Sequence, residues 1–107
     1  MKLKIGARQY NIVFSDNDSL LNDEKNSGSY GYIDYANSNI VIKNSVDSTF
    51  REENTIHEIL HSLLDNSGIE DILKGTEVKT ELLISILTPR FHQLLKENKE
   101  LLNNLIS

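Results

Sequence analysis

The sequence predicts one α+β domain in which strands come first and helices follow. Short apolar runs separated by turn residues fill the first half, and longer segments with apolar residues at helical spacing fill the second. The chain has 107 residues, which is enough for one compact core and too few for two. We therefore treat residues 1–107 as a single domain.

Two β-hairpins are expected in the first half of the chain. Leu3–Ile5 and Tyr10–Phe14 are short apolar runs on either side of a turn that contains glycine. Tyr30–Asp34 and Asn39–Lys43 flank a second turn, and isoleucines alternate with other residues in the latter run as in a half-buried strand. The sequence therefore predicts N-terminal antiparallel strands.

The segment between the two hairpins, residues 15–29, is polar and rich in turn-forming residues. Such a composition is typical of a loop. One helical turn is expected within it, near Leu20 and Leu21.

The second half predicts a long helix followed by one or two more. Asp47, Ser48 or Thr49 can cap the first helix, and Thr49 with Glu52 fits a capping box. Apolar residues then recur at helical spacing up to Gly68. This glycine is expected to end the helix, because glycine adopts the left-handed conformation at little cost.

A second helix is expected after a short link. Thr76 can cap it, and it runs through Leu87. Pro89 either kinks that helix or opens a third one with Thr88 as its cap, because proline lacks the amide hydrogen that a helix interior uses. Leucines at helical spacing continue to the end of the chain. We expect them to pack on the core rather than to form a dimer interface.

The composition narrows the function classes. The net charge is −5 with no concentrated basic stretch, which argues against direct nucleic-acid binding. No run of about 18 apolar residues is present to cross a membrane, and the first residues do not resemble a secretion signal. There is no cysteine, so we expect a cytoplasmic protein whose metal sites use only His, Asp and Glu.

The motif HEILH, from His57 to His61, lies inside the first predicted helix. Residues four apart on a helix differ by about 40° around its axis, so both imidazoles project from one side and can meet one ion. Zinc accepts neutral histidine nitrogen in such sites. Glu58 lies about 100° further round, where it can take a proton from a metal-bound water as general base and return it to the leaving amine.

A catalytic zinc usually has a third protein ligand. We rank Glu81 first, because it borders the apolar stretch LLISIL and a carboxylate at a core needs a partner. Glu77 is second, since the dipole of its helix already explains an acidic residue there, and His92 is third. Three further acidic residues follow the motif: Asp65, Glu70 and Asp71. Asp65 can instead accept a hydrogen bond from an imidazole and orient it without binding the metal.

An ordinary amphipathic helix with two accidental histidines is the simplest alternative. The chain has three histidines, and HExxH arises by chance in a chain of this length with odds on the order of one in a hundred or less. The zinc interpretation is therefore preferred.

Beyond the motif, the chain resembles the zincin metallopeptidases, and specifically the small ImmA/IrrE-type group often carried by phages and mobile elements. The resemblance covers roughly residues 31–98. It rests on GYIDYANSNIVIKN as the strand region before the active helix, on REENTIHEILHSLLD as that helix, and on TELLISILTPRFHQLLKEN as the downstream helix with its glutamate. Ser85 stands where the related gluzincins carry an aspartate, so the partner that supports one histidine stays unassigned.

The resemblance implies a small zincin-like domain with Zn²⁺ as its cofactor. It implies His57, His61 and Glu81 as the metal ligands and Glu58 as the general base and acid. It also implies that the strand Asn39–Lys43 binds an extended peptide at the sheet edge, and an internal or unused strand is the alternative. The oxyanion donor stays open among four residues: Tyr30, Tyr32, Tyr35 and His92.

Three functions are compatible with this pattern. The first is a zinc-dependent metallopeptidase that hydrolyses a peptide bond in a protein or peptide, and the resemblance suggests a transcriptional regulator as substrate. The second is a zinc-binding interaction or regulatory protein without peptidase activity, which the small size favours. The third is a helical phage accessory protein that binds no metal.

Overall fold

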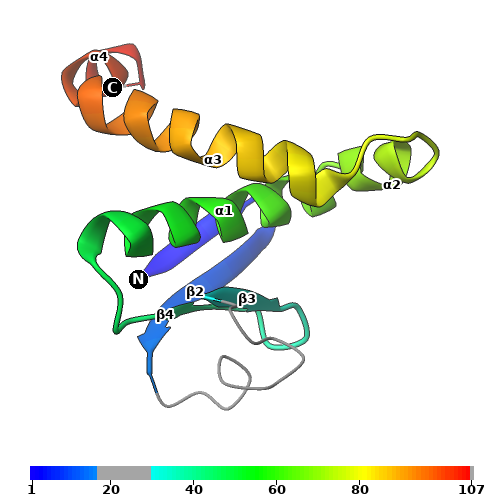
Figure 1. Ribbon diagram of the computed structural model, residues 1–107, viewed down its shortest axis with the longest axis horizontal. Helices are drawn as coiled ribbons and strands as arrows, with labels where there is room; N and C mark the ends of the chain where they lie inside the picture. The colour runs from blue at the N-terminus through cyan, green and yellow to red at the C-terminus, as the bar shows by residue number, and fades with distance from the viewer. Residues whose placement is uncertain (17–29, 107) are drawn as a thin grey trace.

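The computed structural model describes residues 1–16 and 30–106 and confirms the predicted α+β class. Within these residues, a four-stranded sheet formed by the N-terminal half is followed by helices (Figure 1). The helical turn expected near Leu20 and Leu21 lies outside the described residues.

Both predicted hairpins are present. β1 (Lys2–Ile5) pairs antiparallel with β2 (Arg8–Ser15), and β3 (Gly31–Asp34) pairs antiparallel with β4 (Asn39–Lys43). The hairpins join through a parallel pairing of β2 with β4, so the strand order is β1-β2-β4-β3. The sheet is therefore mixed.

The expectation that Asn39–Lys43 binds a peptide at the sheet edge is wrong. This segment is β4, which pairs with β2 on one side and β3 on the other. Its three central residues are buried, as in an interior strand. β3 lies at the edge of the sheet instead.

The HEILH motif lies in α1 (Ser48–Asn66), which begins as the sequence predicts. Asp47 is the cap, and its carboxylate accepts a hydrogen bond of 2.9 Å from the Phe50 amide. Thr49 lies inside the first turn, so its capping box does not form. Gly68 follows the helix with a φ of 78°, the left-handed conformation that glycine tolerates.

The region after α1 differs from prediction. The link contains a short helix, α2 (Ile69–Lys74), and Thr76 is not a cap because its hydroxyl donates to the Leu73 carbonyl. The next helix, α3 (Thr80–Glu97), begins three residues after Glu77 and continues through Pro89. A final helix, α4, spans Lys99–Ile106.

Pro89 is accommodated inside α3 and does not open a third helix. Its missing amide hydrogen leaves the carbonyl four residues earlier, that of Ser85, without its usual helical donor. One residue before the proline, the buried Thr88 hydroxyl donates to the Ile84 carbonyl over 2.7 Å. The helix therefore persists with one backbone hydrogen bond fewer.

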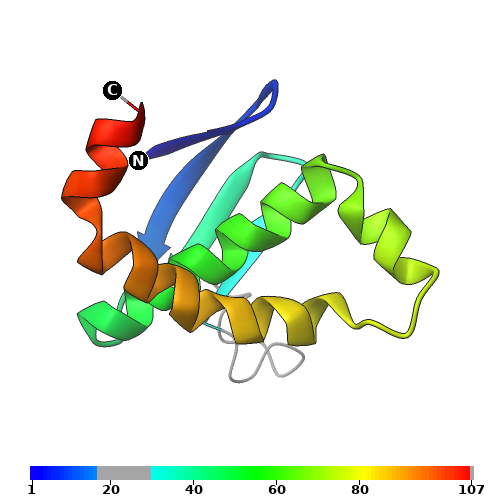
Figure 2. The same cartoon turned by 90° about the horizontal axis from the view of Figure 1, so that it is seen from above.

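The molecule is layered, with α1 between the sheet and α3 (Figures 1 and 2). The sheet contributes most of the apolar core, which Ile59 of α1 covers from the helix side. On α3, Ile84 is fully buried. The buried residues of the core cluster are Ile5, Tyr10, Ile12, Ile40 and Ile42.

The final helix does not pack on the core as expected. α4 contains no buried residue, and Leu105 is 70% exposed. It packs against the end of α3. Among the described residues, no helix is long and apolar enough to cross a membrane.

Candidate metal centre

Two histidines of α1 face one glutamate of α3. The Nε2 atom of His57 lies 2.8 Å from one carboxylate oxygen of Glu81, and the Nε2 atom of His61 lies 2.7 Å from the other. The two imidazole centroids are 4.9 Å apart. The fold therefore brings together the three side chains that the sequence ranks first as metal ligands.

The packing of α3 on α1 places Glu81. Ile84 lies three residues after Glu81, so both project from the same side of α3. Ile84 is fully buried, whereas the Glu81 side chain is 64% exposed. The helix is therefore anchored next to a carboxylate that is still open to solvent. The histidine side chains are mostly buried, at 23% and 21% exposure.

The donor set suits a transition metal. One ligand atom from each of His57, His61 and Glu81 lies within 4.8 Å of the others. Two imidazoles and one carboxylate form a ligand set found in catalytic zinc sites, which keep a fourth position open. Burial lowers the pKa of His57, with the nearby charge of Glu81 opposing this. The neutral imidazole, which is the metal-binding form, is thereby favoured.

Glu58 lies in the same pocket as the three ligand candidates. This pocket has a volume of about 340 Å³, and Tyr30, Gly31 and Asn54 complete its lining. Burial raises the pKa of Glu58 to about 7, although the charge of His61 acts in the opposite direction. A carboxyl group whose pKa is near neutrality exchanges protons readily at physiological pH.

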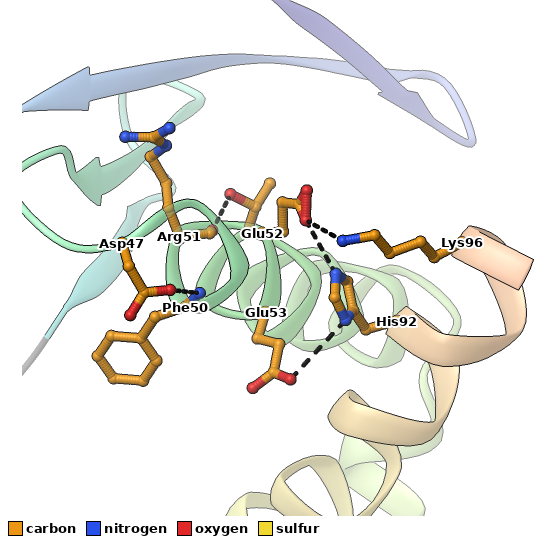
Figure 3. Close-up of polar contacts among 8 residues, drawn as sticks. Asp47, Phe50, Arg51, Glu52, Glu53, His92 and Lys96 are labelled. Carbon is orange, nitrogen blue, oxygen red and sulfur yellow. Dashed lines mark hydrogen bonds and ion pairs between the residues drawn. The ribbon is translucent and has the colours of Figure 1, made fainter.

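The lower-ranked ligand candidates lie elsewhere. His92 bonds to Glu52 through Nε2 at 3.0 Å, and its Nδ1 lies 3.8 Å from Glu53 (Figure 3). Glu77 lines an apolar hollow beside Val78 and Leu82. Neither residue joins the cluster, and each lines a different pocket.

The acidic residues closer to the motif also stay apart from the cluster. Asp71 pairs with Lys74 at 3.6 Å. Asp65 is exposed. The charges of Asp65 and Glu70 act on Tyr35, where burial and these charges raise the pKa to about 12.

Tyr30 is the one oxyanion candidate among the described residues that lines the pocket. Its ring packs edge-to-face on Phe50, with centroids 4.6 Å apart. Tyr32 and Tyr35 are absent from the pocket lining, and His92 lines another pocket.

Two further residues at the site are not among the candidates that the sequence predicts. Asn54 lies three residues before His57, and its Nδ2 atom is buried with no hydrogen-bond partner among residues 1–16 and 30–106. Gly31 lies on β3, and a Cβ atom there would be 3.3 Å from Cγ of Glu58. Helical spacing from His57 is the only sequence clue to Asn54, whereas Gly31 depends on how β3 meets α1.

A comparison of the chain with protein-family models, with curated proteins and with solved structures finds no match.

Proposed function

We propose that this protein is a zinc-dependent metallopeptidase of the zincin type. The observation that carries the proposal is the convergence of His57, His61 and Glu81 from two helices beside the Glu58 carboxyl group. The resemblance to the ImmA/IrrE-type group points the same way. In this proposal the first three residues hold the metal and the fourth moves protons.

The chain's own residues account for the proton transfers. A bound zinc ion supplies Lewis acidity, which lowers the pKa of water and polarises the scissile carbonyl. Glu58 takes a proton from the attacking water and returns it to the leaving amine. Its partial burial and raised pKa support this role, since the group can hold and release a proton near pH 7.

The substrate in this proposal is a protein or extended peptide. The exposed side chain of Glu81 leaves the pocket open to solvent, which a polypeptide substrate requires. The family resemblance suggests a transcriptional regulator. The acidic, cysteine-free composition supports a cytoplasmic location without direct nucleic-acid binding.

A zinc-binding regulatory protein without peptidase activity is the alternative. The pocket volume of about 340 Å³ favours it, because that is near the lower limit for sites that enclose a ligand.

Metal content tests the proposal first. The protein purified without chelator and supplied with zinc should carry one zinc per chain. The His57→Ala/His61→Ala variant should lose it, and Glu81→Ala should bind it more weakly, by roughly 10-fold or more. Glu77→Ala is the matched control and should bind zinc like the wild type. An absence of zinc in the wild type would overturn the proposal.

Glu58→Gln separates the two functions. The amide keeps the size of the side chain but cannot accept the proton, so zinc should remain while peptide-bond hydrolysis falls by roughly 100-fold or more. The biological activity of the zinc-loaded protein should fall with it. Full activity in Glu58→Gln would favour the regulatory alternative.

A further inference from the structure

A second pocket lies on the other side of α1 from the metal centre. It is formed by β2, the first half of α1 and the end of α3, with a volume of about 340 Å³. Among the described residues, it shares no lining residue with the pocket around Glu58. Any ligand it holds is therefore separate from the proposed peptidase site.

The floor of this pocket is apolar. Phe14 of β2, Ile56 of α1, Leu95 of α3 and Met1 are its apolar lining residues. Phe14 and Leu95 are 37% and 45% exposed. Covering these side chains removes apolar surface from water, which is favourable by about 25 cal/mol per Å².

The rim of the pocket is cationic in an acidic protein. Three cationic residues line it, Arg51, Lys96 and Lys99, against the single carboxylate of Glu52. The Arg51 guanidinium already donates to Asn44, which leaves Lys96 and Lys99 for a ligand. The chain as a whole has a net charge of −5. This local excess of positive charge favours an anionic group at the rim.

The carboxylate of Glu52 already contacts two neighbouring side chains. His92 contacts its carboxylate at 3.0 Å and Lys96 at 3.7 Å, as Figure 3 shows. The hydrogen bond from His92, and to a smaller extent the charge of Lys96, hold the pKa of Glu52 below its usual range. The Lys96 side chain is still 55% exposed, so it can contact a second anion.

The volume of the pocket suits a small ligand. Its volume falls at the lower end of the roughly 300–1,000 Å³ that small-molecule sites occupy. Most lining residues lie inside α1 and α3, whose backbone groups are bonded within each helix. Recognition therefore depends on side chains, which offer an apolar surface and positive charge.

We propose that this pocket binds a small amphiphilic carboxylate of the alkanoate class. The alkyl chain packs on Phe14, Ile56 and Leu95, and the carboxylate lies at the rim beside Lys96 and Lys99.

Isothermal titration calorimetry of the full chain with decanoate tests the proposal. Decanoate should bind, whereas decan-1-ol, which has the same chain and no charge, should bind at least roughly 10-fold more weakly. The Lys96→Glu/Lys99→Glu variant should weaken decanoate binding by about 10-fold or more. Lys74→Glu/Arg90→Glu makes the same charge change outside the pocket and should leave binding unchanged.

Amide chemical shifts in the zinc-supplied protein locate the ligand. Shifts on adding decanoate should centre on Ile56 and Leu95. Shifts centred on His57 and Glu81 would overturn the proposal, as would equal binding by both charge variants or equal affinity for decan-1-ol. Tighter binding of a leucine-terminated peptide with a free carboxylate would also overturn it, in favour of a polypeptide end.

Discussion

The side chain of Glu58 lies close to Gly31, a residue without a side chain. Gly31 lies where an added Cβ atom would be 3.0 Å from Cδ1 of Ile42, 3.2 Å from the Val41 carbonyl and 3.3 Å from Cγ of Glu58. The first two groups belong to a buried central strand, so they move little. A side chain at this position would therefore require Ile42, the Val41 backbone or Glu58 to shift by a few tenths of an ångström.

Gly31→Ala should lower the free energy of unfolding by about 1–3 kcal/mol through overpacking. It should also reduce peptide-bond hydrolysis by the zinc-loaded protein, while the zinc content stays at one per chain. Urea unfolding and metal analysis measure the two effects. Gly75→Ala is the control, because a Cβ atom there would meet its nearest neighbour at an ordinary 3.6 Å. Equal stability of the two variants would contradict the close contact.

At the residue scale, the sequence predicts site residues that share one helix better than site residues that lie on separate elements. His57, Glu58 and His61 share one helix, so the spacing of HEILH alone relates them. Glu81 lies on another helix, and the sequence favours it as the third metal ligand because an apolar stretch follows it. Asn54 has no such mark, because an asparagine on a helix is an ordinary residue in sequence. Only the structure shows that its amide is buried with no partner in the described part of the chain.

At the scale of the element, α1 depends on its first turn. The Asp47 carboxylate accepts the hydrogen bond from the Phe50 amide, one of the donors that a helix start leaves without a helical partner. A carboxylate there also interacts favourably with the helix dipole. The motif begins three turns further along the same helix, so the cap supports the site as well as the fold.

Asp47→Ala should lower the free energy of unfolding by about 1 kcal/mol, the usual effect of losing such a cap. Thr49→Ala tests the capping box that the sequence also allows, and it should change stability by less than about 0.5 kcal/mol. Denaturant unfolding of both variants provides the measurement. A larger loss for Thr49→Ala would mean that the helix is capped differently in solution.

The stability that Glu52 contributes to the contact between α1 and α3 depends on pH. Because the pKa of Glu52 is lowered in the folded protein, its ionised form stabilises the fold. This contribution is complete above the unfolded pKa of about 4.5 and is lost as the pH falls through the lower folded value.

Glu52→Gln should therefore be less stable than the wild type at pH 7, and the difference should shrink towards zero between about pH 5 and pH 3. Urea unfolding across this range measures it. Glu100→Gln on α4 is the matched control, for which no comparable trend is expected. A difference between Glu52→Gln and the wild type that grows as the pH falls would show that the sign is wrong.

Helix boundaries followed the sequence where a cap or a glycine marked them. Asp47 and Gly68 delimit α1 as expected. α2 was missed because six residues are too few for a helical pattern to repeat. Thr76 has the chemistry of a cap but uses its hydroxyl on the preceding turn, a choice that depends on the folded backbone.

At the scale of the whole molecule, the proposed metal links two helices that are far apart in sequence. His61 and Glu81 are separated by all of α2 and the turns around it. A ligand that binds only the folded state stabilises it, by about 2.7 kcal/mol when its concentration is 100 times the dissociation constant.

Zinc should therefore raise the melting temperature by roughly 10 °C, and excess chelator should reverse the change. Glu81→Ala should show a smaller shift, because one of three ligands is missing, while Glu77→Ala should behave like the wild type. Thermal unfolding followed by circular dichroism measures this. No shift in the wild type at saturating zinc would contradict the proposed site.

The fold class was predictable from the whole sequence, and the sheet order was not. Strand and helix patterns are local, and each hairpin is marked by its own turn. The parallel pairing aligns Asn11 with Asn39, and no local pattern specifies which hairpin edges meet. The expected peptide-binding strand was wrong for this reason, because β4 was assigned to an edge that only the sheet order defines.

The same parallel pairing sets the order in which the protein can assemble during its synthesis on the ribosome. The β1–β2 hairpin is available early, but a lone two-stranded hairpin is only marginally stable in water. The four-stranded sheet can form only after β4 has left the ribosome. The next element is α1, which carries His57 and His61. Glu81 leaves the ribosome later still. A nascent chain thus presents two of the three proposed metal ligands first, and the third follows only after α2 and the start of α3 have emerged.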